Sequence, residues 1–395
     1  MKNKTIAVLT HYYKSQNFGG NFQAYALCET LRILGFSVEQ VCVNYKKLCK
    51  NIIPQKTFSA RIKQKGIIGC CFSVLKKYLN KFNNRFICKD LQKNNVVNRR
   101  VQAFEYFNNE IIPNSKVEYT QDDIIDCLNK YGAFITGSDQ VWNPKWYFPP
   151  FFLDFVPSDR PKISYAASLG TNKLTDSQKE LYIEHLKDFK AISVREKDAV
   201  DLLKDITPVE PQYVVDPTLL LERGDWDKVC SERQINDKYI ICYFLGDNKK
   251  ARKAAQKLAK EKGLKLINIA YAGGNNAYFN IKFGDIKLYD ASPQDFISLI
   301  KHAEYVFTDS FHAVVFSYIY QKQYFVFNRD KSGSMNSRIY SITELFNQPE
   351  RFCFCKDREK FEYVNNLNDA DYSIKNEKLE QMIEKSKKFL LDNLN

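Results

Sequence analysis

Short apolar runs alternate along the chain with stretches in which apolar positions recur at helical spacing. Six runs in the first half are typical of buried strands: residues 4–10, 36–43, 131–138, 163–170, 191–196 and 212–221. A helix is expected over about 21–34, where Gly35 provides a stop. This alternation predicts an α/β architecture in which helices cover parallel sheets.

The second half begins a fresh series of the same kind. Strands are expected at residues 239–246, 264–270, 304–310 and 323–327. Helices are expected at 249–262, after the Ser-Pro start at Ser292, and directly after Ser310. Pro217 and Gly224 interrupt the pattern, so we expect a first domain at 1–215 and a second at 216–375. A charged amphipathic helix at 376–394 can pack back on the first domain.

Composition agrees with two folded domains. The 395 residues exceed what one core organises, and 44% hydrophobic residues exclude wholesale disorder. The first residues do not read as a signal peptide, so we expect none, and no run reaches the ~18 apolar residues that a membrane span needs. The eleven cysteines form no CxxC pair, which favours free thiols over disulfides or a metal site. We therefore expect a cytoplasmic protein.

The net charge of +13 is concentrated in one segment. Fifteen Lys or Arg lie between Lys46 and Arg100 against a single acid, Asp90. Residues 46–110 are thus predicted to form a basic helical insertion in the first domain. Basic amphipathic helices bind anionic membrane surfaces, but the same spacing fits a solvated insertion that packs on its own domain. Nucleic acid is the weaker reading and we expect none, because no nucleic-acid module accompanies the charge.

Ligands in open α/β sheets collect beyond the carboxyl ends of the strands, which directs attention to the residues there. Of the four histidines, His185 and His302 fall inside expected helices, whereas His312 and His11 follow strands. His312, at a strand-to-helix turn, is either a proton donor or a cap of that turn. His11 is the second candidate.

Cationic candidates follow the strands as well. Arg195 suits a carboxylate or phosphate, or else forms an ion pair with Glu196 or Asp198. The basic Ser/Gly-rich loop at 328–339 contains Arg329, Lys331 and Arg338. Backbone N–H groups that open the helix at 310–320 offer a further place for phosphate.

Two loops carry candidates for binding sugar. Asp139, Gln140 and Trp142 follow a central strand and suit sugar hydroxyls and a sugar face, or else cap the next turn and pack inward. Four small or amide-bearing residues form a glycine loop that permits close approach of a ligand, or only a turn: Asn17, Gly19, Gly20 and Asn21.

Five motifs in register resemble those of the polysaccharide pyruvyl transferase family. They are FITGSDQVWNP, ISYAASLG, ISVREKDAV, VVDPTLLL and VFTDSFHAVVFSYIYQKQYFVF, and NFGGNFQAYAL resembles the opening of that family. The resemblance covers roughly 5–45 and 130–345. It implies two Rossmann-like domains facing a cleft, as in GT-B glycosyltransferases. It also implies phosphoenolpyruvate as co-substrate without a cofactor or metal, and an envelope or capsular sugar as acceptor.

The resemblance also assigns roles. His312 matches the general acid and Arg195 matches a donor-binding arginine of that family. The second domain is expected to bind the donor. Ser310 stands where the family often has arginine, so Arg338, Arg329 or Lys331 is expected to replace that cation beside Ser310 and Phe311. The acceptor is expected against the first domain, at residues Asn17, Gly19, Gly20, Asn21, Asp139, Gln140, Trp142 and His11.

Two other functions stay open at this stage. One is a GT-B glycosyltransferase with a nucleotide-sugar donor, and the other is a catalytically silent sugar-binding or assembly subunit. For the leading function, a polyprenyl-linked acceptor would explain a basic segment on the cytoplasmic face of the inner membrane.

Overall fold

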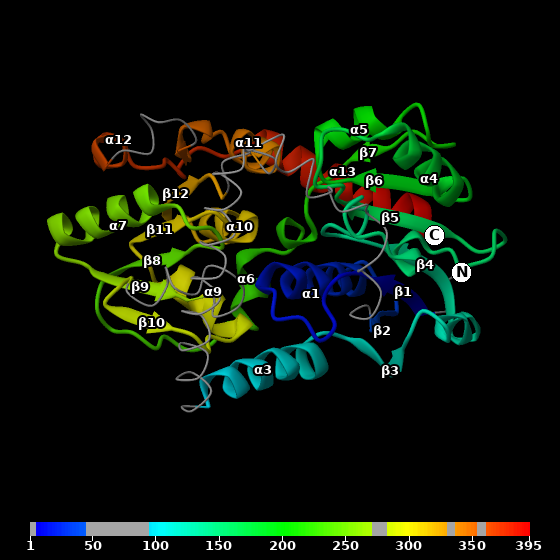
Figure 1. The fold of residues 1–395 in the computed structure, drawn as a ribbon, viewed down its shortest axis with the longest axis horizontal. Helices are drawn as coiled ribbons and strands as arrows, with labels where there is room; N and C mark the ends of the chain where they lie inside the picture. The colour runs from blue at the N-terminus through cyan, green and yellow to red at the C-terminus, as the bar shows by residue number, and fades with distance from the viewer. Residues whose placement is uncertain (1–4, 45–94, 271–282, 330–335, 354–360) are drawn as a thin grey trace, which may run out of the picture.

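Two parallel sheets lie side by side in the protein, each covered by helices (Figure 1). This computed structural model describes residues 5–44, 95–270, 283–329, 336–353 and 361–395. The first sheet has the strand order β3-β2-β1-β4-β5-β6-β7, and the second has the order β10-β9-β8-β11-β12-β13. All recorded strand pairs are parallel, which confirms the α/β class with two Rossmann-like units.

The strands of the first sheet are β1 (Thr5–Leu9), β2 (Val38–Val43), β3 (Asn114–Tyr119), β4 (Tyr131–Thr136), β5 (Lys162–Ala167), β6 (Ala191–Val194) and β7 (Gln212–Tyr213). The strands of the second sheet are β8 (Tyr239–Tyr243), β9 (Lys265–Ile269), β10 (Ile286–Leu288), β11 (Tyr305–Thr308), β12 (Gln323–Phe327) and β13 (Phe352–Cys353). The α-helices are α1 (Phe18–Ile33), α3 (Val96–Tyr106), α4 (Asp176–Leu186), α5 (Lys197–Leu203), α6 (Arg223–Asp227), α7 (Lys249–Lys262), α9 (Pro293–Lys301), α10 (Phe311–Ile319), α11 (Asn336–Leu345), α12 (Phe361–Asn366) and α13 (Glu377–Leu394). Short helices of other types are η1 (Phe107–Ile111, a π-helix) and the 3-10 helices η2 (Ile124–Asn129), η3 (Pro149–Phe152), η4 (Pro217–Leu219) and η6 (Pro349–Arg351).

Two elements differ from the sequence prediction for identifiable reasons. Helix α1 begins at Phe18 instead of residue 21, because the side chain of Asn17 accepts a hydrogen bond from the backbone of Gly19 and caps the helix there. The strand expected at 212–221 is only the two-residue β7. Beyond it Asp216 caps η4, and Pro217 has no N–H to donate to a sheet.

Helix α1 lies between the sheets (Figure 1), and its aromatic side chains contact the second domain. The ring centroid of Phe18 is 4.6 Å from that of Phe296, and Phe22 is 4.7 Å from Phe316. Tyr25 lies 5.5 Å from Trp226. These spacings place two helical turns of the first domain in a continuous aromatic core with the second.

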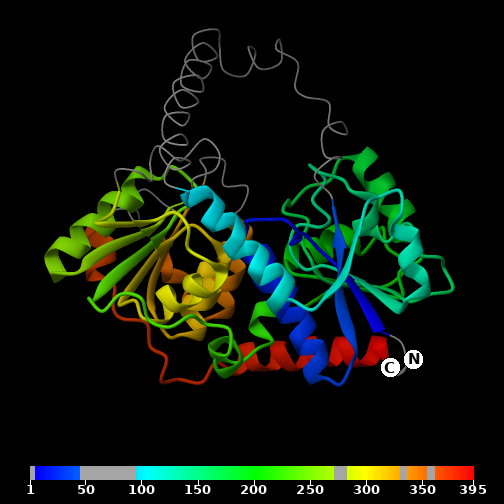
Figure 2. The ribbon, with the colours of Figure 1, turned by 90° about the horizontal axis from the view of Figure 1, so that it is seen from below.

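Helix α13 crosses back under the first domain, as Figure 2 shows. Its N-cap Asn376 donates to the carbonyl of Leu345 in the second domain at 2.8 Å. Farther along, the hydroxyl of Ser386 accepts from the backbone of Val215 at 3.0 Å, and Phe389 lies against Tyr165 in the first domain. The helix therefore joins the two domains.

Most of the predicted basic insertion lies outside the described residues, which resume at its end with α3. There Arg100 is buried, with its guanidinium 4.9 Å from the rings of both Phe18 and Phe104. Arg99 forms an ion pair with Asp290 of the second domain at 2.7 Å. In this part the basic residues pack on the protein itself. Among the described helices, none has the length and apolar character that crossing a bilayer requires.

The described cysteines are all free thiols, as the sequence predicts: Cys28, Cys42, Cys127, Cys230, Cys242 and Cys353.

Candidate active site

His312 lies where the two domains meet, in the first turn of α10 directly after β11. Its side chain is only 9% exposed. On one side a methyl group built on Gly19 would come within 2.1 Å of its Nδ1, so the start of α1 touches the ring. On the other side Nε2 lies 3.7 Å from Oδ2 of Asp216. The imidazole therefore lies between the first domain and Asp216. At position 19, only glycine leaves room for the ring.

Asp216 is the functional residue that the sequence analysis missed. Its Oδ2 accepts from Nη1 of Arg195 at 2.6 Å, and its Oδ1 accepts from the backbone and hydroxyl of Thr218 at 3.0 and 2.7 Å. Burial alone would raise its pKa, but His312 and Arg195 outweigh burial and hold the pKa of Asp216 well below its usual value. A signal was present, because a lone acid in the apolar run VVDPTLLL requires a buried partner.

Arg195 follows β6 and is surrounded by carboxylates. Besides Asp216, its Nη2 lies 3.5 Å from Asp139 and its Nε 3.6 Å from Glu196. Its guanidinium also packs 4.7 Å from the ring of Phe311. Burial opposes its charge, but the three acids outweigh it and raise the pKa of Arg195. Arg195 therefore forms the ion pair with Glu196 that the sequence offered as an alternative, and it pairs with Asp139 and Asp216 as well. Its charge is compensated within the protein.

Arg338 of α11 has a different environment. It is 8% exposed, and among the residues described no carboxylate lies within ion-pair distance of it. In the amide orientation that satisfies both groups, the side-chain oxygen of Gln140 accepts from its Nη1 at 2.7 Å and its Nη2 at 3.2 Å. Burial, and next the repulsion of Arg195, lower the pKa of Arg338 to about 10. Glu196 and Asp139 favour its charge from longer range, but the guanidinium forms no ion pair with a described carboxylate and is therefore free to bind an anion directly.

Asp139 and His11 extend the cluster on the side of the first domain. Burial opposes ionisation of Asp139, but Arg195, His312, His11 and Arg338 outweigh it and lower its pKa. His11 packs edge-on against Phe151 at 4.3 Å, and burial lowers its pKa against the opposing charge of Asp139. The structure therefore gathers His11, Asp139, Arg195, His312 and Arg338 from five separate segments.

Several other predicted site residues have structural partners instead. Trp142 is fully buried, stacks on Phe152 and donates its indole N–H to the carbonyl of Phe151, so the expected stacking on a sugar is wrong in this structure. The side-chain amide of Asn21 is buried and donates to backbone carbonyls of the α1 start, while Asn108 donates to its oxygen. Gly20 lies against the carbonyl of His11.

Donor-site residues on the second domain are placed in part. Ser310 is the N-cap residue of α10, buried at 7% exposure, with no side-chain capping bond. Arg329 donates to the carbonyl of Asp309 at 3.4 Å. Lys331 lies outside the described residues. Within the described ranges, no group of three or more His, Cys, Asp or Glu is arranged to hold a metal ion.

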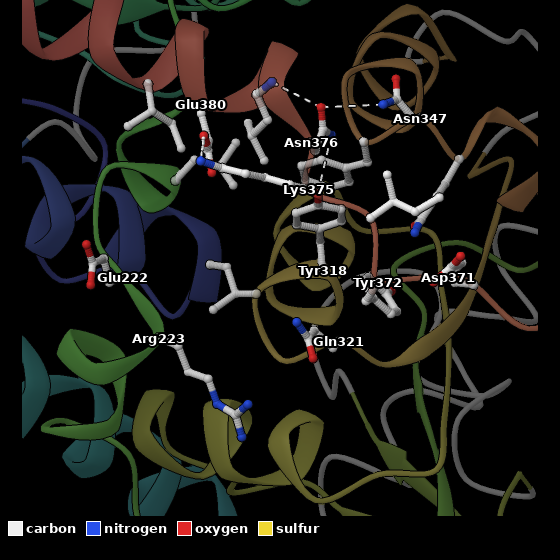
Figure 3. A pocket seen from close by; sticks show the side chains of 18 of the residues that line it. Glu222, Arg223, Tyr318, Gln321, Asn347, Asp371, Tyr372, Lys375, Asn376 and Glu380 are labelled. Carbon is white, nitrogen blue, oxygen red and sulfur yellow. Dashed lines mark hydrogen bonds and ion pairs between the residues drawn. The ribbon is translucent and has the colours of Figure 1, made fainter.

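A cavity of about 990 Å³ lies at the far end of α10, between the linker and the start of α13 (Figure 3). It is lined by Glu222, Arg223 and Tyr318, and its Lys375 and Glu380 pair with each other at 2.7 Å. No histidine is among its lining residues, and its charges are mixed. We therefore assign the chemistry to the cluster around His312 and not to this larger space.

Comparison with known proteins gives one family. The model of the polysaccharide pyruvyl transferase family matches residues 17–331. A search of curated proteins found no match to the chain.

Solved structures reveal likeness of fold. The chain resembles UDP-N-acetylglucosamine 2-epimerase from Rickettsia bellii, at 10% identity and TM-score 0.53, over 99% of this chain and 97% of that one. It resembles UDP-GlcNAc 2-epimerase from Methanocaldococcus jannaschii at 11% identity and TM-score 0.52, over 96% and 98%. For Arabidopsis thaliana UGT89C1 complexed with UDP-L-rhamnose the values are 9% and 0.50, over 99% and 98%. These likenesses confirm the GT-B type of fold and carry no statement about ligands.

Proposed function

Because the chain belongs to the polysaccharide pyruvyl transferase family, we propose that it transfers the enolpyruvyl group of phosphoenolpyruvate to a sugar, closes it as a pyruvate ketal and releases phosphate. The observation that carries the proposal is that a buried histidine, His312, and a buried arginine that forms no ion pair with a described carboxylate, Arg338, both lie close enough to Asp139 to lower its pKa. Ketal formation from an anionic enol ester needs one proton donor and one anchor for negative charge.

In this mechanism His312 delivers a proton to the methylene carbon of phosphoenolpyruvate. A sugar hydroxyl then forms a bond to the adjacent carbon, and phosphate leaves as its C–O bond breaks. A second hydroxyl of the same sugar attacks that carbon and closes the ring. The two hydroxyl protons balance the step, because one restores His312 and the other leaves with phosphate.

Arg338 is the stronger candidate for holding the donor. Arg195 already faces three carboxylates, so an additional anion gains little from it. Arg338 contacts the amide of Gln140 and forms no ion pair with a described carboxylate, so a donor carboxylate or phosphate would supply a direct countercharge. The backbone N–H groups at the start of α10, after Ser310, offer further hydrogen bonds to phosphate.

Asp139 and His11 are titratable groups of the first domain in this cluster, and they are the candidates for receiving the acceptor hydroxyls. The acceptor we propose is an envelope or capsular sugar, or its polyprenyl-linked precursor. In the second case the enzyme works on the cytoplasmic face of the inner membrane, and the basic segment after Lys46 contacts anionic lipid.

The test is release of phosphate from phosphoenolpyruvate in the presence of galactose- and mannose-terminated lipid-linked acceptors, with mass analysis of the product. We expect acceptor-dependent release and a product heavier by one pyruvate ketal. His312→Gln should abolish both, whereas His302→Gln, a histidine whose Nδ1 contacts the carbonyl of Ser298, should not. Turnover of a nucleotide sugar would instead establish the glycosyltransferase alternative. Sugar binding without turnover of either donor would establish a silent subunit.

A further inference from the structure

Asp216 lies in the linker between the domains, the segment that runs from β7 of the first sheet to β8 of the second. One of its oxygens faces residues of both domains. Its Oδ2 accepts from Nη1 of Arg195, in the first domain, at 2.6 Å and from the hydroxyl of Ser138 at 3.3 Å. The same oxygen lies 3.7 Å from Nε2 of His312, in the second domain.

The surroundings of His312 give this arrangement a chemical consequence. Its Nε2 is buried and has no hydrogen-bond partner among the described residues, and the carboxylate of Asp216 is the acceptor that faces it. The separation is longer than a hydrogen bond, but such contacts often tighten when substrate binds. An ionised carboxylate can only accept, so it favours a proton on Nε2 and leaves Nδ1 to exchange protons on the side next to Gly19.

We propose that Asp216 is a positioning residue, which fixes the tautomer and orientation of His312 so that Nδ1 carries the transferable proton. It acts through the imidazole and does not touch the donor. The assignment rests on the proposed function for the identity of the reaction, but the tautomer itself does not depend on any reaction. Thr218 holds the other oxygen of the carboxylate, so Asp216 cannot rotate away without losing two hydrogen bonds.

The first experiment measures the tautomer directly. Long-range ¹H–¹⁵N NMR of protein labelled in its four histidines resolves which ring nitrogen carries the proton, and His312→Gln assigns the signals. In the wild-type protein, above the titration of the ring, we expect His312 to be protonated at Nε2. Protonation at Nδ1 would overturn the proposal without any variant being made.

The second experiment compares two changes to the same carboxylate. Asp216→Asn keeps the shape of the side chain but removes its charge. Its amide either points the N–H₂ toward His312, or points it toward Thr218 and loses a hydrogen bond there. In either orientation the Nε2–H tautomer should no longer dominate. We expect kcat to fall about 100-fold with the KM for phosphoenolpyruvate changed by less than about threefold. Thr218→Val removes one of the two hydrogen bonds that hold Oδ1, the one at 2.7 Å, and leaves the charge in place, so the tautomer should be retained and kcat should fall much less than in Asp216→Asn.

The tautomer separates positioning from a purely structural role. The charges that face the His312 ring are Asp216 and, at longer range, Asp139, with Arg195 behind both. Loss of the Asp216 charge removes the acceptor that favours a proton on Nε2, so the tautomer should change in Asp216→Asn. A tautomer equal to the wild type in Asp216→Asn, with kcat reduced only as much as in Thr218→Val, would refute the role. If the wild-type protein showed the Nε2 tautomer but no turnover of phosphoenolpyruvate, the proposed function would fail and the positioning would stand.

Discussion

A single methyl group at Gly19 tests whether the histidine at the domain junction is the reacting group. Gly19 is the second residue of α1, and its N–H donates to the capping Asn17 at 3.1 Å. A Cβ at this position would lie 2.1 Å from Nδ1, 2.5 Å from Cε1 and 2.9 Å from Cγ of His312. Ordinary contact begins at 3.4 Å, so the Gly19→Ala methyl and the ring cannot both keep their places.

The size of the effect follows from these distances. To restore contact, the imidazole must retreat by more than about 1 Å, and a misplacement of about 1 Å costs about 100-fold in rate. It would retreat toward Asp216, whose Oδ2 is already 3.7 Å from Nε2. Helix propensity acts in the opposite direction, because alanine stabilises a helix by about 1 kcal/mol relative to glycine. The free energy of unfolding should therefore change by less than the activation free energy of the reaction does.

The assay is acceptor-dependent phosphate release by Gly19→Ala, together with thermal unfolding. The matched control is Gly224→Ala in α6, where a Cβ would meet nothing within 4 Å. We expect wild-type turnover from the control and a loss of about 100-fold from Gly19→Ala, with the fold retained. Equal turnover in the two variants would refute the placement of His312 against α1 or its role in the reaction.

Three further predictions concern the proposed donor-binding Arg338, the carboxylate of Asp139 and the interface between the domains. Arg338→Met should raise the KM for phosphoenolpyruvate about 10- to 100-fold without lowering Tm, because it removes a buried charge that forms no direct ion pair with a described carboxylate; a lowered Tm with unchanged KM would contradict the assignment. The pKa of Asp139 is lowered in the folded protein, so the stability it supplies is complete above the ordinary carboxyl range and is lost as pH falls through the folded value. Asp139→Asn should therefore flatten the acid side of a plot of unfolding free energy against pH, which urea titrations measure. Phe22→Ala, which removes a ring 4.7 Å from Phe316, should lower the free energy of unfolding by about 3–5 kcal/mol in the same titrations.

The sequence predicted most of the strands and helices because each apolar run is read locally, and the helix at 249–262 matches α7 to the residue. It did not predict β3 or β10. It also placed His312 and Arg195 correctly at carboxyl ends of strands. What it could not supply were side-chain directions after those strands. Trp142 turns inward, and the sequence could not predict this because beyond β4 no periodicity indicates which side it faces.

Contacts between segments far apart in sequence were the other omission. Asp216 was missed because residues 212–221 were interpreted as one strand, and a single acid within a strand did not suggest a role at the site. The proximity of Gly19 to His312 depends on packing between domains, and no local pattern encodes it. The Phe18, Phe22 and Tyr25 spacing does mark one apolar helix face, but it does not identify the partner.

The N-terminal turns of α1 explain why the candidate site and the interface between the domains form one unit. In α1 the aromatic residues Phe18 and Phe22 pack on the second domain, and between them Gly19 touches the imidazole that the second domain contributes. Any opening of the domains that separates Phe22 from Phe316 must also draw Gly19 away from His312. Large cooperative interfaces resist such motion, whereas small polar ones permit it. We therefore expect the proton donor to be set in place by domain packing before any substrate arrives, with binding left to adjust only side chains and loops.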